Sequence, residues 1–494
     1  MMDKQYFRGG LWALILFSMG ALSIVLHGII STCDYWWHLK AGEWMISNQS
    51  IPFTDVFSWY ASANNFYWMS HEWLSEVVLA GFDHIVRFIA PSTTSHFSGY
   101  LITACSLFLL MVILSLFNAK HYIKNVFVTM GWIILGTLLL SSVATPRPHL
   151  FSYLLLALTM GSLEHFRKTK TTKLLYLIPA YAFAWVNFHG GSSNLPYLLC
   201  LIYLISGLFS FDWRGLTASK WSHKERKQLL VTAMYSFIVL ILNPHGLKMI
   251  AYPYENMQDS YMLSIINEWQ SPLLRLDGHL LVLIQVLLVV LVLLFKNRKL
   301  EFTDFLVLGG FTYLTIGSIR FSPMLYIISS FVLFPYFENV IQLKKELPLK
   351  LTKPIYQWLL GVGGLLFIGY WLFQLPSRQV DVFPLLLSEE MIEAVKTENP
   401  SRLYNHYDFG SELIYHDIPV FVDGRADLYS KTILKDAVDL GFVQQDPVTL
   451  FTKYEFDYVL TYKESNLSYY LKSYPNATLI TEDEIAVFYK LTIE

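Results

Sequence analysis

The chain has 494 residues, a formal net charge of −2, 54% hydrophobic residues and only 15% charged residues. This is more apolar material than one soluble core needs, so the composition excludes an ordinary water-soluble protein. Three cysteines also exclude a disulfide framework. We expect a polytopic membrane protein whose main surroundings are the lipid bilayer, with no nucleic-acid partner.

Apolar runs of about 17–24 residues recur along the first three quarters of the chain, and this length crosses a hydrocarbon core of roughly 30 Å. Because a helix satisfies its own backbone hydrogen bonds in lipid, the runs predict about eleven transmembrane helices. The runs lie near 9–30, 98–117, 125–144, 149–165, 173–190, 194–210, 229–245, 279–296, 302–319, 322–340 and 355–374. The predicted fold class is an all-α polytopic membrane bundle with a small extracytoplasmic α/β domain.

Lysine and arginine are concentrated in alternate loops between these runs. The rich set comprises the N-terminus and residues 118–124, 166–173, 211–228, 296–301 and 341–354. Loops rich in these residues stay in the cytoplasm. The N-terminus is therefore expected in the cytoplasm, and an odd number of helices puts the C-terminal part outside, in the cell membrane of its source.

The segment 73–89 would break this alternation if it crossed the membrane. It carries Glu76, Asp83 and Arg87 as a polar stripe on an otherwise apolar helix. We expect this helix to lie in the outer interface, which makes residues 31–97 one large external loop. The tryptophans around it fit an aromatic belt at headgroup depth.

The composition changes after residue 375, where the chain becomes acidic and has no long apolar run. We expect residues 1–375 to form the transmembrane domain and residues 376–494 a separate soluble α/β domain. Its β-rich pieces are 419–422, 457–460 and 485–489, and helices are predicted near 387–397, 431–441 and 446–454.

Polar residues gather at the extracytoplasmic ends of the predicted helices. An ionisable group near a membrane interior costs several kcal/mol unless it is paired or hydrated. Convergence of such groups from separate segments indicates one hydrated site. Its candidate members are Asp34, His71, Glu72, Arg147, His149, Asn187, His189, Asn243, His245, Glu268 and Arg320.

Each of these residues also has a structural interpretation when taken alone. Asp34 fits a helix N-cap, the histidines fit hydrogen-bonding groups at the interface, and the asparagines fit turns. Arg147 and Arg320 fit snorkelling side chains, but two arginines can also grip a phosphate bidentately. An anionic lipid headgroup matches this set. The sequence has no Walker loop, no dinucleotide fingerprint, no zinc spacing and no nucleophile elbow.

The order of these features resembles the GT-C superfamily of membrane glycosyltransferases, and more narrowly a poorly characterised bacterial branch of it. One N-terminal helix precedes an acidic residue, a long external loop, about ten further spans and an external C-terminal domain. The segments that carry the resemblance are 34–44 (DYWWHLKAGEW), 52–58 (PFTDVFS), 71–74 (HEWL), 185–190 (WVNFHG) and 422–429 (VDGRADLY).

The resemblance implies inverting transfer of a sugar from a polyprenyl-phosphate donor to a glycan, lipid or protein acceptor. Asp34 matches the loop carboxylate that acts as general base or as ligand of a divalent metal ion, and His71 and Glu72 join it as catalytic candidates. Many relatives have a second aspartate two residues earlier, where this chain has Thr32. Asp55 is a candidate second metal ligand. Asp423 and Arg425 are the candidates in the tail.

Two other classes of function compete with this interpretation. A membrane transporter or flippase for a lipid-linked or anionic substrate could use the same histidines, arginines and carboxylate as a substrate path. The sequence shows no repeated halves, which transporters often have. A non-catalytic assembly or adhesion protein would use mainly its external tail.

Overall fold

A computed structural model describes residues 4–25, 34–124, 126–141, 143–256, 266–273, 279–296, 298–336, 362–363, 365–366, 369–370, 386–429 and 431–492. The chain divides into two compact units. The bundle unit comprises Met1–Ile30 and Tyr100–Val380, and the mixed unit comprises Ser31–Gly99 and Asp381–Glu494. The described chain is mostly helical with a small sheet near the C-terminus, which confirms the coarse prediction.

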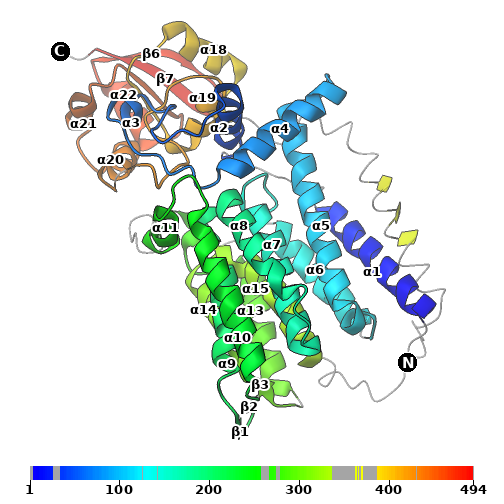
Figure 1. The fold of residues 1–494 in the computed structure, drawn as a ribbon. Helices are drawn as coiled ribbons and strands as arrows, with labels where there is room; N and C mark the ends of the chain where they lie inside the picture. The colour runs from blue at the N-terminus through cyan, green and yellow to red at the C-terminus, as the bar shows by residue number, and fades with distance from the viewer. Residues whose placement is uncertain are drawn as a thin grey trace. The chain divides into compact units, whose positions relative to one another are not determined.

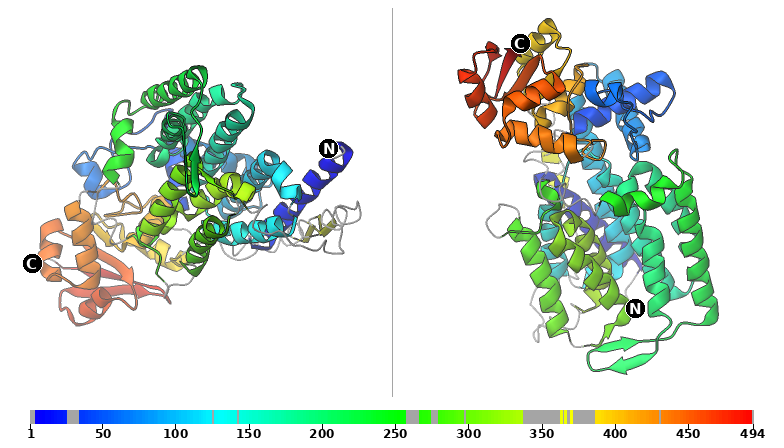
Figure 2. Two further views of the ribbon diagram at one scale, coloured as in Figure 1. Left: turned by 90° about the horizontal axis from the view of Figure 1, so that it is seen from below. Right: turned by 90° about the vertical axis from the view of Figure 1, so that its left-hand side faces the viewer.

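The bundle unit consists of helices that run side by side, as the views in Figure 1 and Figure 2 show. Its helices are α1 (Lys4–Val25), α5 (Ser95–Lys124), α6 (Val126–Ser141), α7 (His149–Thr169), α8 (Ile178–Phe188), α9 (Leu195–Ser206), α10 (His223–Ile238), α11 (Lys248–Asn256), α13 (His279–Phe295), α14 (Phe302–Gly317) and α15 (Ser322–Val332). Three short strands, β1 (Phe211–Trp213), β2 (Leu216–Ala218) and β3 (Leu300–Glu301), form a small sheet. Each predicted apolar run up to 322–340 overlaps one of these helices, whereas 355–374 falls mostly outside the described residues.

Several helices, such as α8 and α9, are shorter than the apolar runs that predict them, whereas α5 and α7 are longer. Among the described residues, one helix, Phe97–Tyr122, is long and apolar enough by itself to cross a membrane. The run 229–245 illustrates the cause, because α10 ends at Ile238 and a 3₁₀ turn, Val239–Ile241, continues to the Asn243-Pro244 turn. The count of about eleven membrane-crossing helices stays a prediction.

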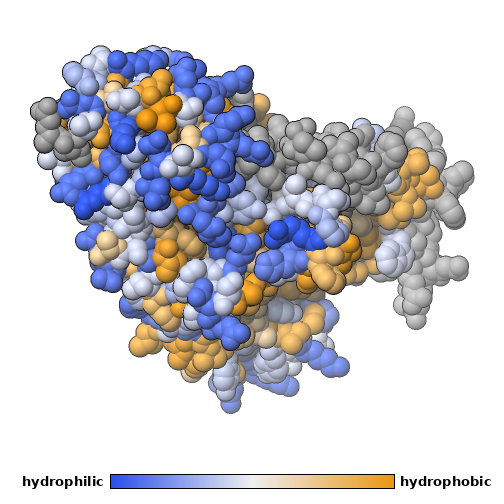
Figure 3. Space-filling view, turned by 90° about the horizontal axis from the view of Figure 1, so that it is seen from above, coloured by the Kyte–Doolittle hydropathy of each residue, from blue (hydrophilic) through white to orange (hydrophobic). Residues whose placement is uncertain are grey.

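Many large apolar side chains of the bundle unit are exposed. Examples from several helices are Leu109, Leu116, Tyr235, Leu287, Leu294 and Tyr313. Hydrophobic side chains also gather in patches on the face of the molecule in Figure 3. Outward-facing apolar side chains of this size need a covering medium or partner.

The mixed unit contains a four-stranded sheet and eight short helices among its described residues. The strands β4 (Leu403–Asn405), β5 (Tyr458–Tyr462), β6 (Ala477–Glu482) and β7 (Ala486–Leu491) have the order β4-β5-β7-β6. The first pair is parallel and the other two pairs are antiparallel. The helices are α2 (Tyr35–Asn48), α3 (Trp59–Ala63), α4 (Trp73–Ile89), α18 (Glu389–Glu398), α19 (Gly410–Tyr415), α20 (Lys431–Phe442), α21 (Pro447–Tyr454) and α22 (Asn466–Ser473).

The sequence predicted some elements of the tail and missed others. Helices α18, α20 and α21 and strands β5 and β7 coincide with predicted segments. The segment 419–422 is different, since Val420 forms only an isolated bridge to Ser58. Strands β4 and β6 were missed.

Hydrogen bonds join the first long loop to the tail inside the mixed unit. Trp59 N donates to Val420 O at 3.0 Å, and Val420 N donates to Phe57 O at 3.2 Å. The Trp59 indole donates to Leu403 O at 3.0 Å. The structure therefore groups 31–99 with 381–494, whereas the sequence boundary at 375 assigned the loop to the transmembrane domain.

The polar stripe of α4 faces protein, and the expectation that this helix lies in the outer interface stays a prediction. Glu76 and Asp83 are buried, and α4 packs closely on α2 because Gly42 has no Cβ to collide with the Glu76 carbonyl. The exposed side chains of α4 are apolar, with Phe88 87% and Ile89 75% exposed. Three of the tryptophans expected in an aromatic belt, Trp36, Trp37 and Trp68, are buried in the protein instead.

Candidate functional site

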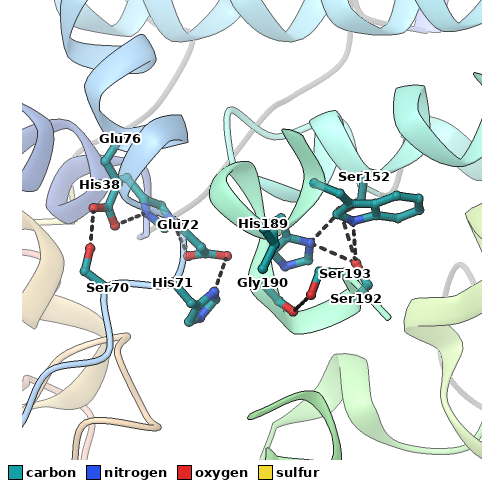
Figure 4. Close-up of polar contacts among 12 residues, drawn as sticks. His38, Ser70, His71, Glu72, Glu76, Ser152, His189, Gly190, Ser192 and Ser193 are labelled. Atoms are coloured by element: carbon teal, nitrogen blue, oxygen red, sulfur yellow. Dashed lines mark hydrogen bonds and ion pairs between the residues drawn. The ribbon is translucent and has the colours of Figure 1, made fainter. Parts of the chain in front are cut away.

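Three side chains of α2 and α4 converge in the mixed unit, and we call them the carboxylate cluster: His38, Glu72 and Glu76. His38 Nδ1 lies 3.3 Å from Glu76 Oε1, and His38 Nε2 lies 3.8 Å from Glu72 Oε2 (Figure 4). One ligand atom from each lies within 4.8 Å of the others. Ser70 Oγ donates to the second Glu76 oxygen at 3.3 Å.

Helical spacing brings these groups together. Asp34 immediately precedes α2 and His38 follows four residues later, so both lie on one face of the helix. Glu72 and Glu76 have the same spacing at the start of α4. The predicted His71 belongs here too, since its Nδ1 lies 3.9 Å from Glu72 Oε1.

The chemistry of the carboxylate cluster fits a divalent cation. One imidazole and two carboxylates are a donor set that divalent metal ions accept in proteins. Burial raises the pKa of Glu76 to about 8, although Ser70 and Arg425 favour its ionised form. A bound cation would supply the positive charge that such a buried carboxylate needs in order to ionise.

Asp34 lies against the tail of the chain. A Cβ on Gly424 would overlap the Asp34 carboxylate and come within 3.1 Å of Trp37 Nε1, so only glycine fits this approach. Among the described residues, none accepts a hydrogen bond from this buried indole nitrogen. The tail segment 422–429 thus contributes backbone to the surroundings of the predicted base.

The other tail candidates, Asp423 and Arg425, form a buried ion network with Asp55. Arg425 donates to Asp55 Oδ1 at 2.5 Å and to Asp423 at 2.6 and 2.8 Å. Asp55 Oδ2 accepts the backbone N–H groups of Phe57 and Ser58. Both oxygens of Asp55 are engaged, so this network is suited to joining the loop to the tail rather than to binding a metal ion.

In the bundle unit, two arginines share one carboxylate, and we call Arg147, Glu268 and Arg320 the arginine cluster. Arg147 Nη1 lies 3.5 Å from Glu268 Oε2, and Arg320 Nη1 lies 3.1 Å from Glu268 Oε1. Burial opposes ionisation of Glu268, but the two arginines outweigh it and lower its pKa to about 2. The predicted convergence of Arg147 and Arg320, from segments far apart in sequence, is present in the structure.

The N-terminal turn of α7 links the arginine cluster to a polar network. His149, two residues after Arg147, donates from Nε2 to Val143 O at 2.9 Å. One turn further, Ser152 Oγ lies 2.6 Å from His189 Nδ1, and Trp185 Nε1 donates to Ser152 Oγ at 2.9 Å (Figure 4). Ser152 Oγ also lies 3.1 Å from Ser192 Oγ, so the direction of the bond to His189 follows the tautomer of that histidine.

Two Asn-x-His-Gly turns bind each other reciprocally, and we call Asn187 and Asn243 the asparagine pair. Asn187 Nδ2 donates to Leu242 O at 3.2 Å, and Asn243 Nδ2 donates to Val186 O at 2.8 Å. Each asparagine therefore binds the carbonyl of the residue that precedes the other. This exchange fixes the two turns that carry His189 and His245.

Sequence reasoning missed His38, Glu76 and Ser152 as site residues. The repeated spacing of four residues, Asp34 to His38 and Glu72 to Glu76, was a usable signal for the first two. Ser152 had no comparable signal, because its partner His189 lies 37 positions away.

No protein-family model matches the sequence, and no curated protein matches it. Among solved structures, the chain is similar to the archaeal oligosaccharyltransferase AglB from Archaeoglobus fulgidus in complex with an inhibitory peptide and a dolichol-phosphate. The TM-score is 0.51 at 12% sequence identity, over 95% of this chain and 73% of that chain. The described chain thus has a fold similar to that of an oligosaccharyltransferase.

Proposed function

We propose that this chain is a membrane glycosyltransferase of the GT-C type. It transfers a sugar from a polyprenyl-phosphate-linked donor to an acceptor at the extracytoplasmic face. The observation that carries the proposal is the carboxylate cluster, one helical turn from Asp34. The fold similarity to an enzyme whose structure contains a dolichol-phosphate supports a lipid-phosphate donor.

The bundle unit is proposed to lie in the membrane, with about eleven membrane-embedded helices and a cytoplasmic N-terminus. Its exposed leucine, valine and tyrosine side chains support this placement, because lipid would cover them. The distribution of lysine and arginine supports the orientation. The mixed unit is then extracytoplasmic.

Asp34 is proposed to act as the general base. Its carboxylate accepts the proton of an acceptor hydroxyl as the acceptor oxygen bonds to the anomeric carbon of the sugar. The bond between that carbon and the phosphate oxygen breaks, and polyprenyl phosphate leaves with the electron pair. Attack from the opposite face inverts the anomeric configuration, and a general base of this kind contributes about 10²–10⁴-fold to the rate.

The arginine cluster is proposed to bind the donor phosphate. Glu268 holds one nitrogen of each guanidinium group, and each such group has five N–H donors in a planar fork that suits phosphate oxygens. His189 and His245 are proposed as further donors to the phosphate or sugar, and His149, whose Nε2 already donates to Val143 O, as an acceptor for a sugar hydroxyl through Nδ1. The asparagine pair positions the turns of His189 and His245.

The carboxylate cluster is proposed to hold a divalent metal ion, which would polarise a phosphate or acceptor oxygen when bound. His38 and Glu72 would each supply one ligand atom. Glu76 would join them once it is ionised. His71 is proposed to orient Glu72 from its other side.

The test is turnover of a short-chain polyprenyl-phosphate hexose by the full-length protein in detergent. Release of polyprenyl phosphate that depends on an added acceptor supports the proposal, and Mn²⁺ binding measured by electron paramagnetic resonance should be lost in Glu72→Gln. Movement of the intact lipid-linked sugar across proteoliposome membranes, without release of polyprenyl phosphate, would establish the flippase alternative instead.

A further inference from the structure

The C-terminal part of the mixed unit contains a cavity of about 610 Å³ that the proposed chemistry does not use. It lies beside the ends of α20 and β5 and the start of α22, which are labelled or coloured in Figure 1. Its lining residues are His406, Gly441, Phe442, Tyr462, Glu464, Ser465, Asn466, Glu484 and Ile485.

Strand topology explains why polar groups meet there. Strands β4 and β5 are parallel, with Leu403 opposite Tyr458, so the chain leaves both strands at the same edge of the sheet. His406 follows β4 directly, and Glu464 follows β5. The carboxyl ends of parallel strands are the usual place for ligands in α/β sheets.

The imidazole of His406 has a fixed orientation in the lining. Its Nδ1 accepts the backbone N–H of Asp408 at 3.3 Å, and its ring packs on Tyr462 with a centroid distance of 4.7 Å. The Tyr462 hydroxyl donates to Asp408 at 3.1 Å, which holds the second ring in place. Since Nδ1 accepts, a neutral His406 carries its proton on Nε2 and can donate there.

The charges of the lining exclude two classes of ligand. Glu464 and Glu484 bring carboxylates and the lining has no lysine or arginine, so an anion such as phosphate would be repelled. The nearby Lys463 instead binds Asp483 O at 3.2 Å and Glu482 at 3.3 Å. A metal ion is also a poor match, because the described residues gather a ligand set only at His38, Glu72 and Glu76.

The remaining surface of the cavity combines apolar walls with hydrogen-bonding groups. Phe442 is 58% exposed and Ile485 39% exposed, so a ligand would cover apolar area that water now contacts. Carboxylate, amide and imidazole groups, from Glu464, Asn466 and His406, are suited to pairs of hydroxyl groups. Sugars present both surfaces at once, an apolar C–H face and a polar hydroxyl edge.

We propose that this cavity binds one neutral sugar unit of a glycan. If the chain is a glycosyltransferase, the cavity is a subsite for a sugar away from Asp34 that holds an acceptor or donor glycan. Sugar binding itself does not depend on turnover.

The test measures binding of methyl glucoside, methyl mannoside and methyl N-acetylglucosaminide to the full-length protein by saturation-transfer difference NMR. The detergent must carry no sugar, and glycerol 3-phosphate serves as the anionic probe. At least one glycoside should bind, and Glu464→Gln and Phe442→Ala should each weaken it about tenfold, the loss expected for one charge-assisted hydrogen bond or a buried aromatic contact. Both side chains are exposed, so these variants should fold; Glu390→Gln, an exposed glutamate on α18, is the matched control.

Failure of all three glycosides to bind, equal binding by both cavity variants, or preferential binding of glycerol 3-phosphate overturns the sugar site. Asp34→Asn separates this proposal from the proposed function, because it should abolish turnover and leave glycoside binding intact. If the wild-type protein bound sugar normally but showed no transfer activity, the proposal of a sugar-binding cavity would stand and the proposed glycosyltransferase activity would be rejected.

Discussion

The carboxylate cluster of the mixed unit and the arginine cluster of the bundle unit differ in the charge they offer a ligand. The first surrounds one histidine with two glutamates, and the second surrounds one glutamate with two arginines. In the first, burial holds Glu76 protonated near neutral pH, whereas in the second two arginines keep Glu268 ionised. The carboxylate cluster therefore lacks a positive charge and is suited to a cation or a proton. The arginine cluster has an excess of positive charge and is suited to an anion.

The largest effect is expected in the mixed unit. Asp34→Asn keeps the size of the side chain but removes the base, so transfer should fall by at least about 10²-fold while protein abundance and Tm persist. The measurement is initial rate with saturating donor. Near-normal turnover would move the role of base to Glu72, and Glu390→Gln should behave as wild type.

A smaller effect is expected in the arginine cluster. Lysine lacks the planar group with which arginine can bind Glu268 and a phosphate oxygen at once. Arg147→Lys or Arg320→Lys should therefore weaken binding of the lipid-linked donor by about 1–3 kcal/mol, which is roughly 5–150-fold in KM. Arg214→Lys, at an exposed position of the same unit, is the control. An unchanged KM in both variants would show that the arginines serve only to bind Glu268.

The two clusters also differ in how far the sequence predicted them. Arg147 and Arg320 were identified as a pair because arginine at helix ends of an apolar bundle is conspicuous. In the mixed unit, Asp34, His71 and Glu72 were identified, but His38 and Glu76 were not, because a buried polar stripe on α4 has the same pattern as an interfacial one. Only the packing of α4 against α2 shows that its polar stripe is buried.

The sequence also predicted the fold of the bundle unit better than the pairing of segments in the mixed unit. Apolar periodicity located the helices of the bundle, since each run forms its own hydrogen bonds. It overestimated the lengths of some helices, because 3₁₀ turns such as Val239–Ile241 depend on tertiary contacts. The pairing of the first loop with the tail depends on Asp55 and Arg425, which are 370 residues apart, and no local pattern reveals such a contact.

The asparagine pair leads to a prediction about the stability of the bundle unit. Asn243→Ala removes the donor to the carbonyl of the buried Val186 and should cost about 1–3 kcal/mol, whereas Asn187→Ala removes the donor to Leu242 O, on an exposed residue, and should cost less. Because the bonds are reciprocal, the double variant should lose less than the sum, which thermal unfolding in detergent measures. Asn118→Ala removes a similar bond to Leu114 O within α5 and should add independently. Strict additivity of the pair would contradict the reciprocal arrangement.

The smallest effect concerns the mixed unit and its response to pH, with no change in turnover expected. Glu412 on α19 accepts the backbone N–H groups of Leu386 and Leu387, yet burial raises its pKa to about 7, above the ordinary 4.5. A raised pKa means that the folded state favours the protonated carboxyl, so this contribution to stability is complete below pH 4.5 and is lost as pH rises through about 7. The Tm of the wild type should therefore fall by a few °C between about pH 5 and 8 relative to Glu412→Gln, which has no such titration. The difference between the two Tm profiles isolates Glu412 from other groups that titrate in this range, including Glu76. Parallel profiles would show that Glu412 ionises in the folded unit as easily as in the unfolded chain, and that its two N–H bonds outweigh its burial.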